Sequence, residues 1–146
     1  MKKICLSLLI TLCTVFAVSA RNNYSRNEDQ LPKAARTMIS NYFKGGVSLV
    51  KTETSMGRVS EYEVILTDGT EISFDRQGNW KDVEVGDSKA VPSQIVPKNI
   101  INYVKSSHPG DKIVGIERKR NGFEVELRSG IEIRFNKTGN FIKYDD

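Results

Sequence analysis

The chain has 146 residues, with two cysteines, one histidine and a formal net charge of +4 at pH 7. Its basic and acidic residues are interleaved, whereas nucleic-acid-binding proteins usually gather basic residues in a patch or stripe. One histidine cannot supply a usual zinc site, and no glycine-rich phosphate loop is followed by Lys-Ser or Lys-Thr. We therefore expect no cofactor, no catalytic residues and no nucleic-acid partner.

The N-terminal residues have the pattern of a bacterial export signal. Two lysines precede an apolar stretch from Ile4 to Val18, and small residues end at Ala20, where we predict cleavage. The stretch is too short for a typical membrane span, and an uncleaved N-terminal anchor is the alternative. Cleavage would remove Cys5 and Cys13 and leave 20 basic and 18 acidic residues, a net charge of +2. We predict a periplasmic or secreted protein with no membrane span after processing.

An internal repeat organises the rest of the chain. Residues 62–80 align without gaps to residues 123–141, and both copies contain Glu-Val-x-Leu, Gly-x-Glu-Ile-x-Phe and Gly-Asn at matching positions. Upstream, Leu31-Pro32-Lys33 matches Val96-Pro97-Lys98. Such self-similarity indicates two copies of one structural unit. The predicted boundaries are a flexible lead-in at residues 21–30, a first unit at 31–87 and a second unit at 91–146.

Each unit is predicted to be one helix followed by four antiparallel strands. Pro32 suits the first turn of a helix that we expect to be capped by Asp29 or Gln30 and to end at Gly45-Gly46; Pro109-Gly110 ends the second helix. After each helix the hydrophobic period changes to two. Asp68-Gly69 and Ser129-Gly130 then predict two-residue hairpin turns. The strands are expected at residues 47–54, 60–67, 71–76 and 80–85, and at 112–120, 123–128, 131–136 and 141–144.

Alternation along the strands assigns two faces to the sheet. Val64 and Phe74 should pack beneath the first helix, and Val125 and Phe135 beneath the second. The opposite face is polar, has no helix to cover it, and would form one broad surface if the two sheets joined edge to edge. The candidate contacts with a partner are Glu63, Ile65, Ser73, Trp80, Glu126, Arg128, Arg134 and Phe141. The two aromatic residues could be anchors, since aromatics dominate interface energetics, or lids over the sheet edge.

Catalytic chemistry has little support in the sequence. His108 stands at the end of a predicted helix and is interpreted as a cap or surface residue. Glu61 and Glu63, two residues apart on one strand, could act as the acid and base of a glycosidase only within an enclosed cleft. On an exposed strand they are solvated and predict surface charge. Residues 75–79 resemble a calcium loop without its closing glutamate, so a hairpin turn is the better interpretation.

Several motifs occur twice and together resemble one protein family. They are Leu/Val-Pro-Lys before a helix, an aromatic residue followed by Glu-Val-x-Leu-x-x-Gly-x-Glu-Ile-x-Phe, and Gly-Asn-Trp/Phe. This combination resembles the PepSY-like, β-lactamase-inhibitor-like family of secreted bacterial proteins. The resemblance implies a tandem fold similar to that of β-lactamase inhibitory protein, and a periplasmic or cell-surface setting in a gut-type Bacteroidetes bacterium. That inhibitor carries disulfides and a partner-inserting loop, neither of which has a counterpart in the mature chain.

The sequence therefore predicts an α+β protein that binds rather than catalyses. The leading hypothesis is a non-enzymatic extracytoplasmic binding or inhibitory module. It would present its open polar sheet face to an unidentified protein or peptide partner of the cell envelope. The alternative is a sensor domain for calcium or a small ligand, acting through the acidic strands.

Overall fold

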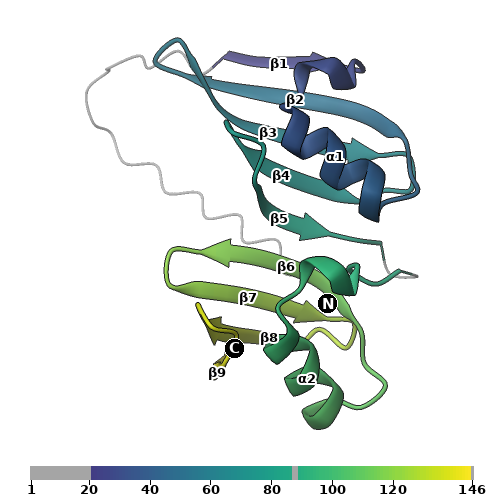
Figure 1. Cartoon of the computed structure of the whole chain (residues 1–146), viewed down its shortest axis with the longest axis vertical. Helices are drawn as coiled ribbons and strands as arrows, with labels where there is room; N and C mark the ends of the chain where they lie inside the picture. The colour runs from purple at the N-terminus through teal and green to yellow at the C-terminus, as the bar shows by residue number, and fades with distance from the viewer. Residues whose placement is uncertain (1–20, 87–88, 146) are drawn as a thin grey trace, which may run out of the picture.

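The computed structural model describes residues 21–86 and 89–145, and the predicted signal peptide lies outside these residues. It is an α+β structure in which nine strands form one antiparallel sheet in chain order, with both α-helices on the same face (Figure 1). Among the described residues, no helix has the length and hydrophobicity that crossing a membrane requires. The elements are β1 (Arg21–Ser25), η1 (Glu28–Gln30), α1 (Lys33–Tyr42), β2 (Val47–Ser55), β3 (Arg58–Leu66), β4 (Glu71–Asp75), β5 (Trp80–Glu84), η2 (Ser93–Ile95), α2 (Lys98–Ser107), β6 (Ile113–Lys119), β7 (Gly122–Leu127), β8 (Glu132–Asn136) and β9 (Phe141–Asp145).

The sheet is continuous, whereas the sequence predicted two sheets of four strands each. Strands β5 and β6 join the two halves, with Asp82 opposite Glu117 and Val83 opposite Ile116. Their main-chain pairing extends one ladder across both halves. One face of the molecule is therefore a single surface that runs from β1 to β9.

The prediction of a flexible lead-in at residues 21–30 is wrong. Residues Arg21–Ser25 form β1, which pairs antiparallel with β2 along its whole length. The following residues form the short helix η1, where the Asp29 N–H donates to Asn27 Oδ1 at 2.9 Å. All the residues of β1 are exposed apart from the half-buried Ser25, so main-chain pairing holds the strand in place and no hydrophobic alternation predicts it.

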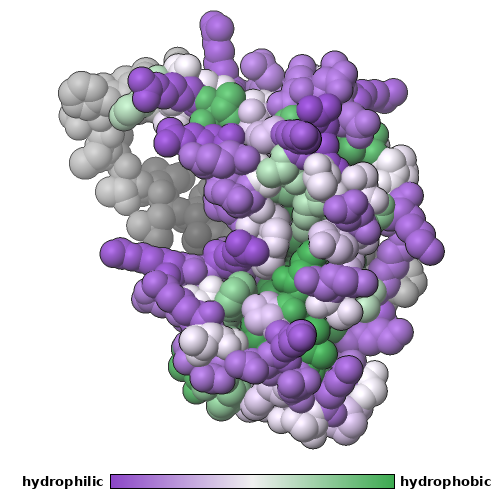
Figure 2. Space-filling model, in the orientation of Figure 1, coloured by the Kyte–Doolittle hydropathy of each residue, from purple (hydrophilic) through white to green (hydrophobic). Residues whose placement is uncertain are grey.

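The hydrophobic core lies between the helices and the sheet, as predicted. Val64, Phe74, Val125 and Phe135 are each at most 1% exposed. The helices contribute buried side chains to the same core cluster, which are Ala35 and Ile39 from α1 and Ile100 and Val104 from α2. Figure 2 shows the helix-bearing face, where hydrophobic surface gathers around the middle and lower part of the view within a largely hydrophilic surround.

The helix starts and hairpin turns differ in detail from the predictions. Each helix has a proline as its N-cap, Pro32 and Pro97, with no side-chain capping bond, so Asp29 and Gln30 are not caps. The helix α1 ends at Tyr42, before the predicted glycine pair. Around Gly69 the loop has three residues, because the Leu66 N–H donates to the Thr70 carbonyl at 2.9 Å. The loop at Gly130 is closed in the same way by Leu127 and Ile131.

Candidate binding face

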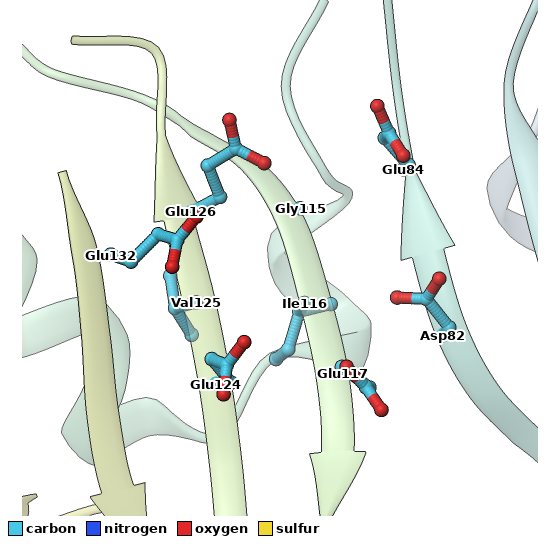
Figure 3. A pocket seen from close by; sticks show the side chains of 9 residues that line it. All are labelled: Asp82, Glu84, Gly115, Ile116, Glu117, Glu124, Val125, Glu126 and Glu132. Carbon is cyan, nitrogen blue, oxygen red and sulfur yellow. The ribbon is translucent and has the colours of Figure 1, made fainter. Parts of the chain in front are cut away.

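The face opposite the helices carries a hollow of about 180 Å³ over β5 to β8. Carboxylate side chains line it from β5 to β8, and both α-helices lie on the other face of the sheet (Figures 1 and 3). We call it the carboxylate hollow. Its lining residues are Asp82, Glu84, Gly115, Ile116, Glu117, Glu124, Val125, Glu126 and Glu132. Six of these nine side chains are acidic, so the hollow has a strongly negative rim.

The hollow exists because β6 has no side chain at Gly115. This glycine lies between Glu84 on β5 and Glu126 on β7 in the ladder. A Cβ placed on it would meet the Glu126 Cβ at 3.4 Å, an ordinary contact distance. A larger side chain would occupy the hollow from below without forcing the backbone apart.

Asp82 shows how strongly the like charges act on one another. Burial, together with the negative charges of Glu117 and Glu84, raises the pKa of its carboxyl to about 6. Glu117 stands directly opposite Asp82 across the β5–β6 pair. Like charges opposite one another destabilise a sheet. Lys119, whose Nζ lies 2.6 Å from Glu117 Oε2, offsets part of this repulsion, and a further cation held between Asp82 and Glu117 would relieve more of it.

A second group of carboxylates lies beside the hollow, toward β9. The carboxylate oxygens of Glu124, Glu132 and Asp145 all lie within 4.8 Å of one another. Arg134 Nε is 3.4 Å from Glu124 Oε2 and also contacts Asp145, and the Lys143 Nζ lies 2.8 Å from Asp145. Glu124 Oε2 is buried and has no hydrogen-bond partner among the described residues. A third cation, Lys119, lies 3.8 Å from Glu124 Oε2, whereas Glu132 has no ion pair among the described residues.

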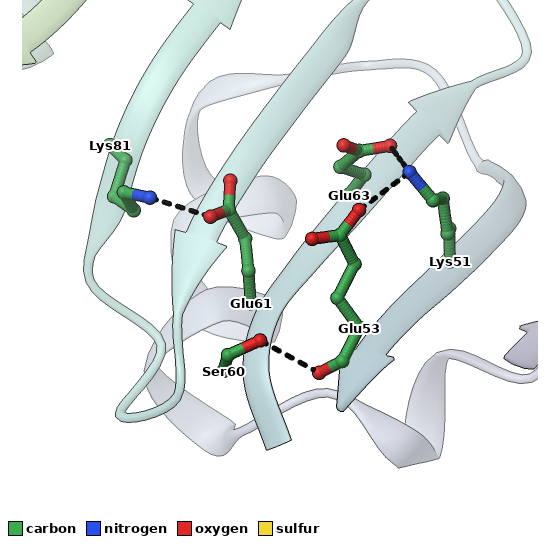
Figure 4. Close-up of polar contacts among 6 residues, drawn as sticks. All are labelled: Lys51, Glu53, Ser60, Glu61, Glu63 and Lys81. Carbon is green, nitrogen blue, oxygen red and sulfur yellow. Dashed lines mark hydrogen bonds and ion pairs between the residues drawn. The ribbon is translucent and has the colours of Figure 1, made fainter. Parts of the chain in front are cut away.

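On the first half of the same face, lysines pair with the neighbouring carboxylates. Lys51 Nζ lies 2.7 Å from Glu53 and 2.9 Å from Glu63, and Lys81 Nζ lies 2.6 Å from Glu61 (Figure 4). The hydrogen bonds that Lys51 donates to Glu53 and Glu63 raise its pKa above the ordinary value. Over β5 to β8, by contrast, Lys119 pairs with Glu117, but Asp82, Glu84 and Glu132 have no ion pair among the described residues.

The structure separates the predicted contact residues into several groups. Glu63 pairs with Lys51, Ile65 is 36% exposed, and Ser73 stands opposite Glu63 and Asp82 in the ladder. Glu126 lines the hollow and Arg134 lies beside it. Arg128 instead donates from Nη2 to the Lys89 carbonyl at 2.6 Å. Only some of the contact residues predicted from the sequence therefore lie near one another in the structure.

Trp80 and Phe141 do not lie on the open face. Trp80 is 8% exposed, and the Arg118 guanidinium lies 3.8 Å from the centre of its ring. Trp80 is therefore neither an exposed anchor nor a lid over the sheet edge, because its side chain is buried in the core beneath the interior strand β5. Phe141 is 40% exposed at the outer edge and stacks on Tyr103 with ring centres 4.9 Å apart.

Sequence reasoning missed most residues of the hollow. Asp82 escaped because the register shifts between Ser73 and Phe74 in the β4–β5 pair, so simple alternation fails in β5. Gly115 and Glu117 join the hollow only through the β5–β6 pairing, which links the two halves. The sequence shows that these strands are rich in acidic residues, but it does not show that their acidic side chains come together around one hollow.

Among the described residues, the side chains considered for catalysis do not lie in an enclosed site. Glu61 and Glu63 lie on the open face with lysine partners, which removes the glycosidase interpretation. His108 caps α2, since its N–H donates to the Val104 carbonyl at 2.8 Å. Asp75 Oδ1 accepts hydrogen bonds from the Gln77 and Asn79 N–H groups, both at 2.9 Å, which confirms the hairpin turn at residues 75–79.

These features define a small α+β domain with one helix-covered face and one free, charged sheet face. The chain belongs to the PepSY-like, β-lactamase-inhibitor-like family, whose model matches residues 60–143. No curated protein resembles the chain closely enough to add a characterised relative.

Two solved structures from Bacteroides have the same fold. A provisionally named periplasmic protein of unknown function from Bacteroides vulgatus is 36% identical, with a TM-score of 0.81 over 86% of this chain and 100% of that one. A Bacteroides thetaiotaomicron protein, provisionally named as calcium-regulated and periplasmic, is 32% identical, with a TM-score of 0.78 over 86% of this chain and 97% of that one. Both names place these neighbours in the periplasm, and the family and its neighbours of unknown function point to a non-catalytic domain.

Proposed function

We propose that the protein is a non-enzymatic binding module of the periplasm, exported by cleavage after Ala20 and built from two related halves. Its open sheet face takes a basic segment of an envelope or secreted protein in the carboxylate hollow. The observation that carries this proposal is the gathering of six carboxylates around one hollow, of which Asp82, Glu84 and Glu132 have no ion pair among the described residues. A lysine or arginine side chain placed between Asp82 and Glu117 would gain charge-assisted hydrogen bonds.

A tetralysine peptide is the probe for this proposal, measured by isothermal titration calorimetry. We expect binding that weakens as salt rises, because exposed charges are screened. The double variant Glu84→Gln/Glu132→Gln removes two charges from the hollow and should weaken binding about fivefold or more. Gly115→Val should weaken it comparably by filling the hollow, with its fold checked by thermal unfolding.

The matched control is Glu53→Gln/Glu61→Gln, which makes the same charge change on the same face. These glutamates are paired with Lys51 and Lys81, so the control should change tetralysine binding less than about twofold. Equal losses in both double variants would show that only general negative charge matters. No binding at millimolar peptide in low salt would refute the proposal.

Calcium is the second candidate ligand. The three carboxylates of Glu124, Glu132 and Asp145 lie close enough to share a cation, and one structural neighbour bears a provisional name as calcium-regulated. Calcium prefers six to eight oxygen ligands, and three carboxylates would supply part of such a shell. Calcium would also have to displace Arg134 from Asp145.

If calcium binds there, millimolar calcium should raise the melting temperature of the wild type, because a ligand of the folded state stabilises it. Glu132→Gln should abolish the rise, and Glu53→Gln/Glu61→Gln should keep it. Magnesium serves as the ion control. An unchanged melting temperature in calcium would dismiss this candidate, and a full rise in Glu132→Gln would exclude this group of carboxylates.

A further inference from the structure

Strand β9 ends the sheet, yet it is built like the interior strand β5. Each follows a tight turn and pairs antiparallel with the strand before it. In both pairs the register shifts at the same point, just before a phenylalanine of the preceding strand. The corresponding pairs are Phe74↔Trp80 and Ile72↔Val83 for β5, and Phe135↔Phe141 and Ile133↔Tyr144 for β9. Phe141 thus takes the position of Trp80, and Tyr144 that of Val83.

The two strands differ in what covers them. Trp80 is 8% exposed and Val83 is fully buried, with β6 paired along the outer edge of β5. In β9, Phe141, Ile142 and Tyr144 are 40%, 53% and 44% exposed, and no described strand pairs with its outer edge. The other edge of the sheet, β1, is mostly polar by contrast. Phe141 and Tyr144 are thus as exposed as Trp80 and Val83 would be if β5 lost its outer neighbour, and Ile142 replaces the exposed Lys81 with an apolar side chain.

The exposed aromatic residues of β9 are held in place from beneath. Tyr103 of α2 stacks on Phe141 with an angle of 7° between the rings. The Tyr144 hydroxyl lies 3.0 Å from the Tyr103 hydroxyl and 3.1 Å from His108 Nε2. Fixed side chains lose little conformational entropy on association, which favours a contact at this edge.

The pairing of β5 with β6 indicates where a further strand would lie. On β5 the paired residues are Asp82, Val83 and Glu84, and their equivalents on β9 are Lys143, Tyr144 and Asp145. An antiparallel neighbour should therefore place a basic residue opposite Asp145, an apolar residue opposite Tyr144 and an acidic residue opposite Lys143. Read from its N-terminus, that neighbour has the order basic, apolar, acidic. Residues 143–145 of this chain have that order themselves.

We propose that two copies of the protein associate through their β9 strands about a two-fold axis. Tyr144 of one copy lies opposite Tyr144 of the other, and Lys143 of each copy pairs with Asp145 of the other. An antiparallel self-pair is an isologous contact, so both ion pairs form at once. The joined strands make one sheet that runs through both copies. A contact of one strand edge is small, which predicts a weak, concentration-dependent dimer.

The test is sedimentation equilibrium of the purified protein from micromolar to millimolar concentration, with variants that reverse the charges. We expect the wild type to dimerise. Lys143→Glu places two acidic pairs in the contact and Asp145→Lys places two basic pairs, so each should weaken dimerisation at least tenfold. An equimolar mixture of the two variants should restore a heterodimer, because its two opposing pairs are again of opposite charge. Arg21→Glu on β1 is the matched control and should leave dimerisation unchanged.

Asp145→Lys also removes the contacts of Asp145 with Arg134 and Lys143 of the same chain, and Lys143→Glu removes the second of these, so thermal unfolding must show that each variant is folded. If Asp145→Lys fails to fold, the comparison of Lys143→Glu with Arg21→Glu, together with concentration-dependent amide protection along β9 in the wild type, still tests the contact. A wild type that stays monomeric at millimolar concentration overturns the proposal and leaves the edge to a segment of another protein. Dimerisation that survives both reversals, or folded variants that fail to associate when mixed, overturns the pairing. None of these results depends on a ligand in the carboxylate hollow.

Discussion

Gly122→Ala should destabilise the protein by about 3 kcal/mol or more, the largest loss expected from any single methyl group added to its glycines. Gly122 begins β7 opposite Asn136 of β8, with φ at +155°. A Cβ there would lie 1.9 Å from the Phe135 carbonyl oxygen and 2.8 Å from backbone atoms of Asn136. Backbone atoms cannot move aside as a flexible side chain can, so relief requires opening the β7–β8 ladder, which also carries the core residue Phe135.

The control for this prediction is Gly130→Ala. Gly130 also has a positive φ, at +87°, but a Cβ on it would have no neighbour within 4 Å. Its cost should be limited to the strained backbone, about 1 kcal/mol. Urea unfolding measured by circular dichroism compares the two free energies of unfolding. Similar losses for both variants would mean that β7 and β8 do not approach as closely as described.

Asp82→Asn should stabilise the protein above pH 6 and remove a pH dependence from its unfolding. The carboxyl has a pKa of about 6 when folded, against an ordinary value of 3.8. Well below pH 3.8 the carboxyl is protonated in both states and contributes nothing. As pH rises to 6 the unfolded chain releases the proton first, so the wild type loses stability over this interval, and the full loss remains above it.

The size of this effect follows from the raised pKa after allowance for solvent. A difference of about two pKa units corresponds to about 3 kcal/mol, and the partial exposure of Asp82 reduces the expected gain to about 1 kcal/mol. Thermal and urea unfolding from pH 4 to 8 measure it, with Glu28→Gln on the distant η1 as the charge control. If the wild type and Asp82→Asn keep parallel stability profiles across this range, Asp82 has no raised pKa.

The parts of the fold that depend on local periodicity could be predicted from the sequence. The alternation around Val64 and Phe74 gave the correct inward face, because residues two apart on a strand share one side. The turn at residues 75–79 was correct because the Asp75 side chain bonds to nearby backbone N–H groups whatever the rest of the chain does. These features need no knowledge of distant partners.

The parts that depend on pairing between distant segments could not. The strand β1 forms because β2 offers a free edge, and its own residues carry no strand pattern. The carboxylate hollow requires Asp82 to meet Glu117 across the β5–β6 pair, between residues on opposite sides of η2 and α2. The sequence shows each acidic residue of the site, but it does not show that these residues meet, because that depends on the register of strands far apart in the chain.

The β5–β6 ladder has three residue pairs, fewer than any other pair of neighbouring strands described. It is the shortest pairing in the sheet. The carboxylate hollow lies across it and is lined by residues of β5, β6 and β7 (Figure 3). A ligand bound in the hollow would contact strands of both halves at once, β5 on one side and β6 and β7 on the other. Binding in the hollow would therefore restrict bending of one half of the molecule relative to the other.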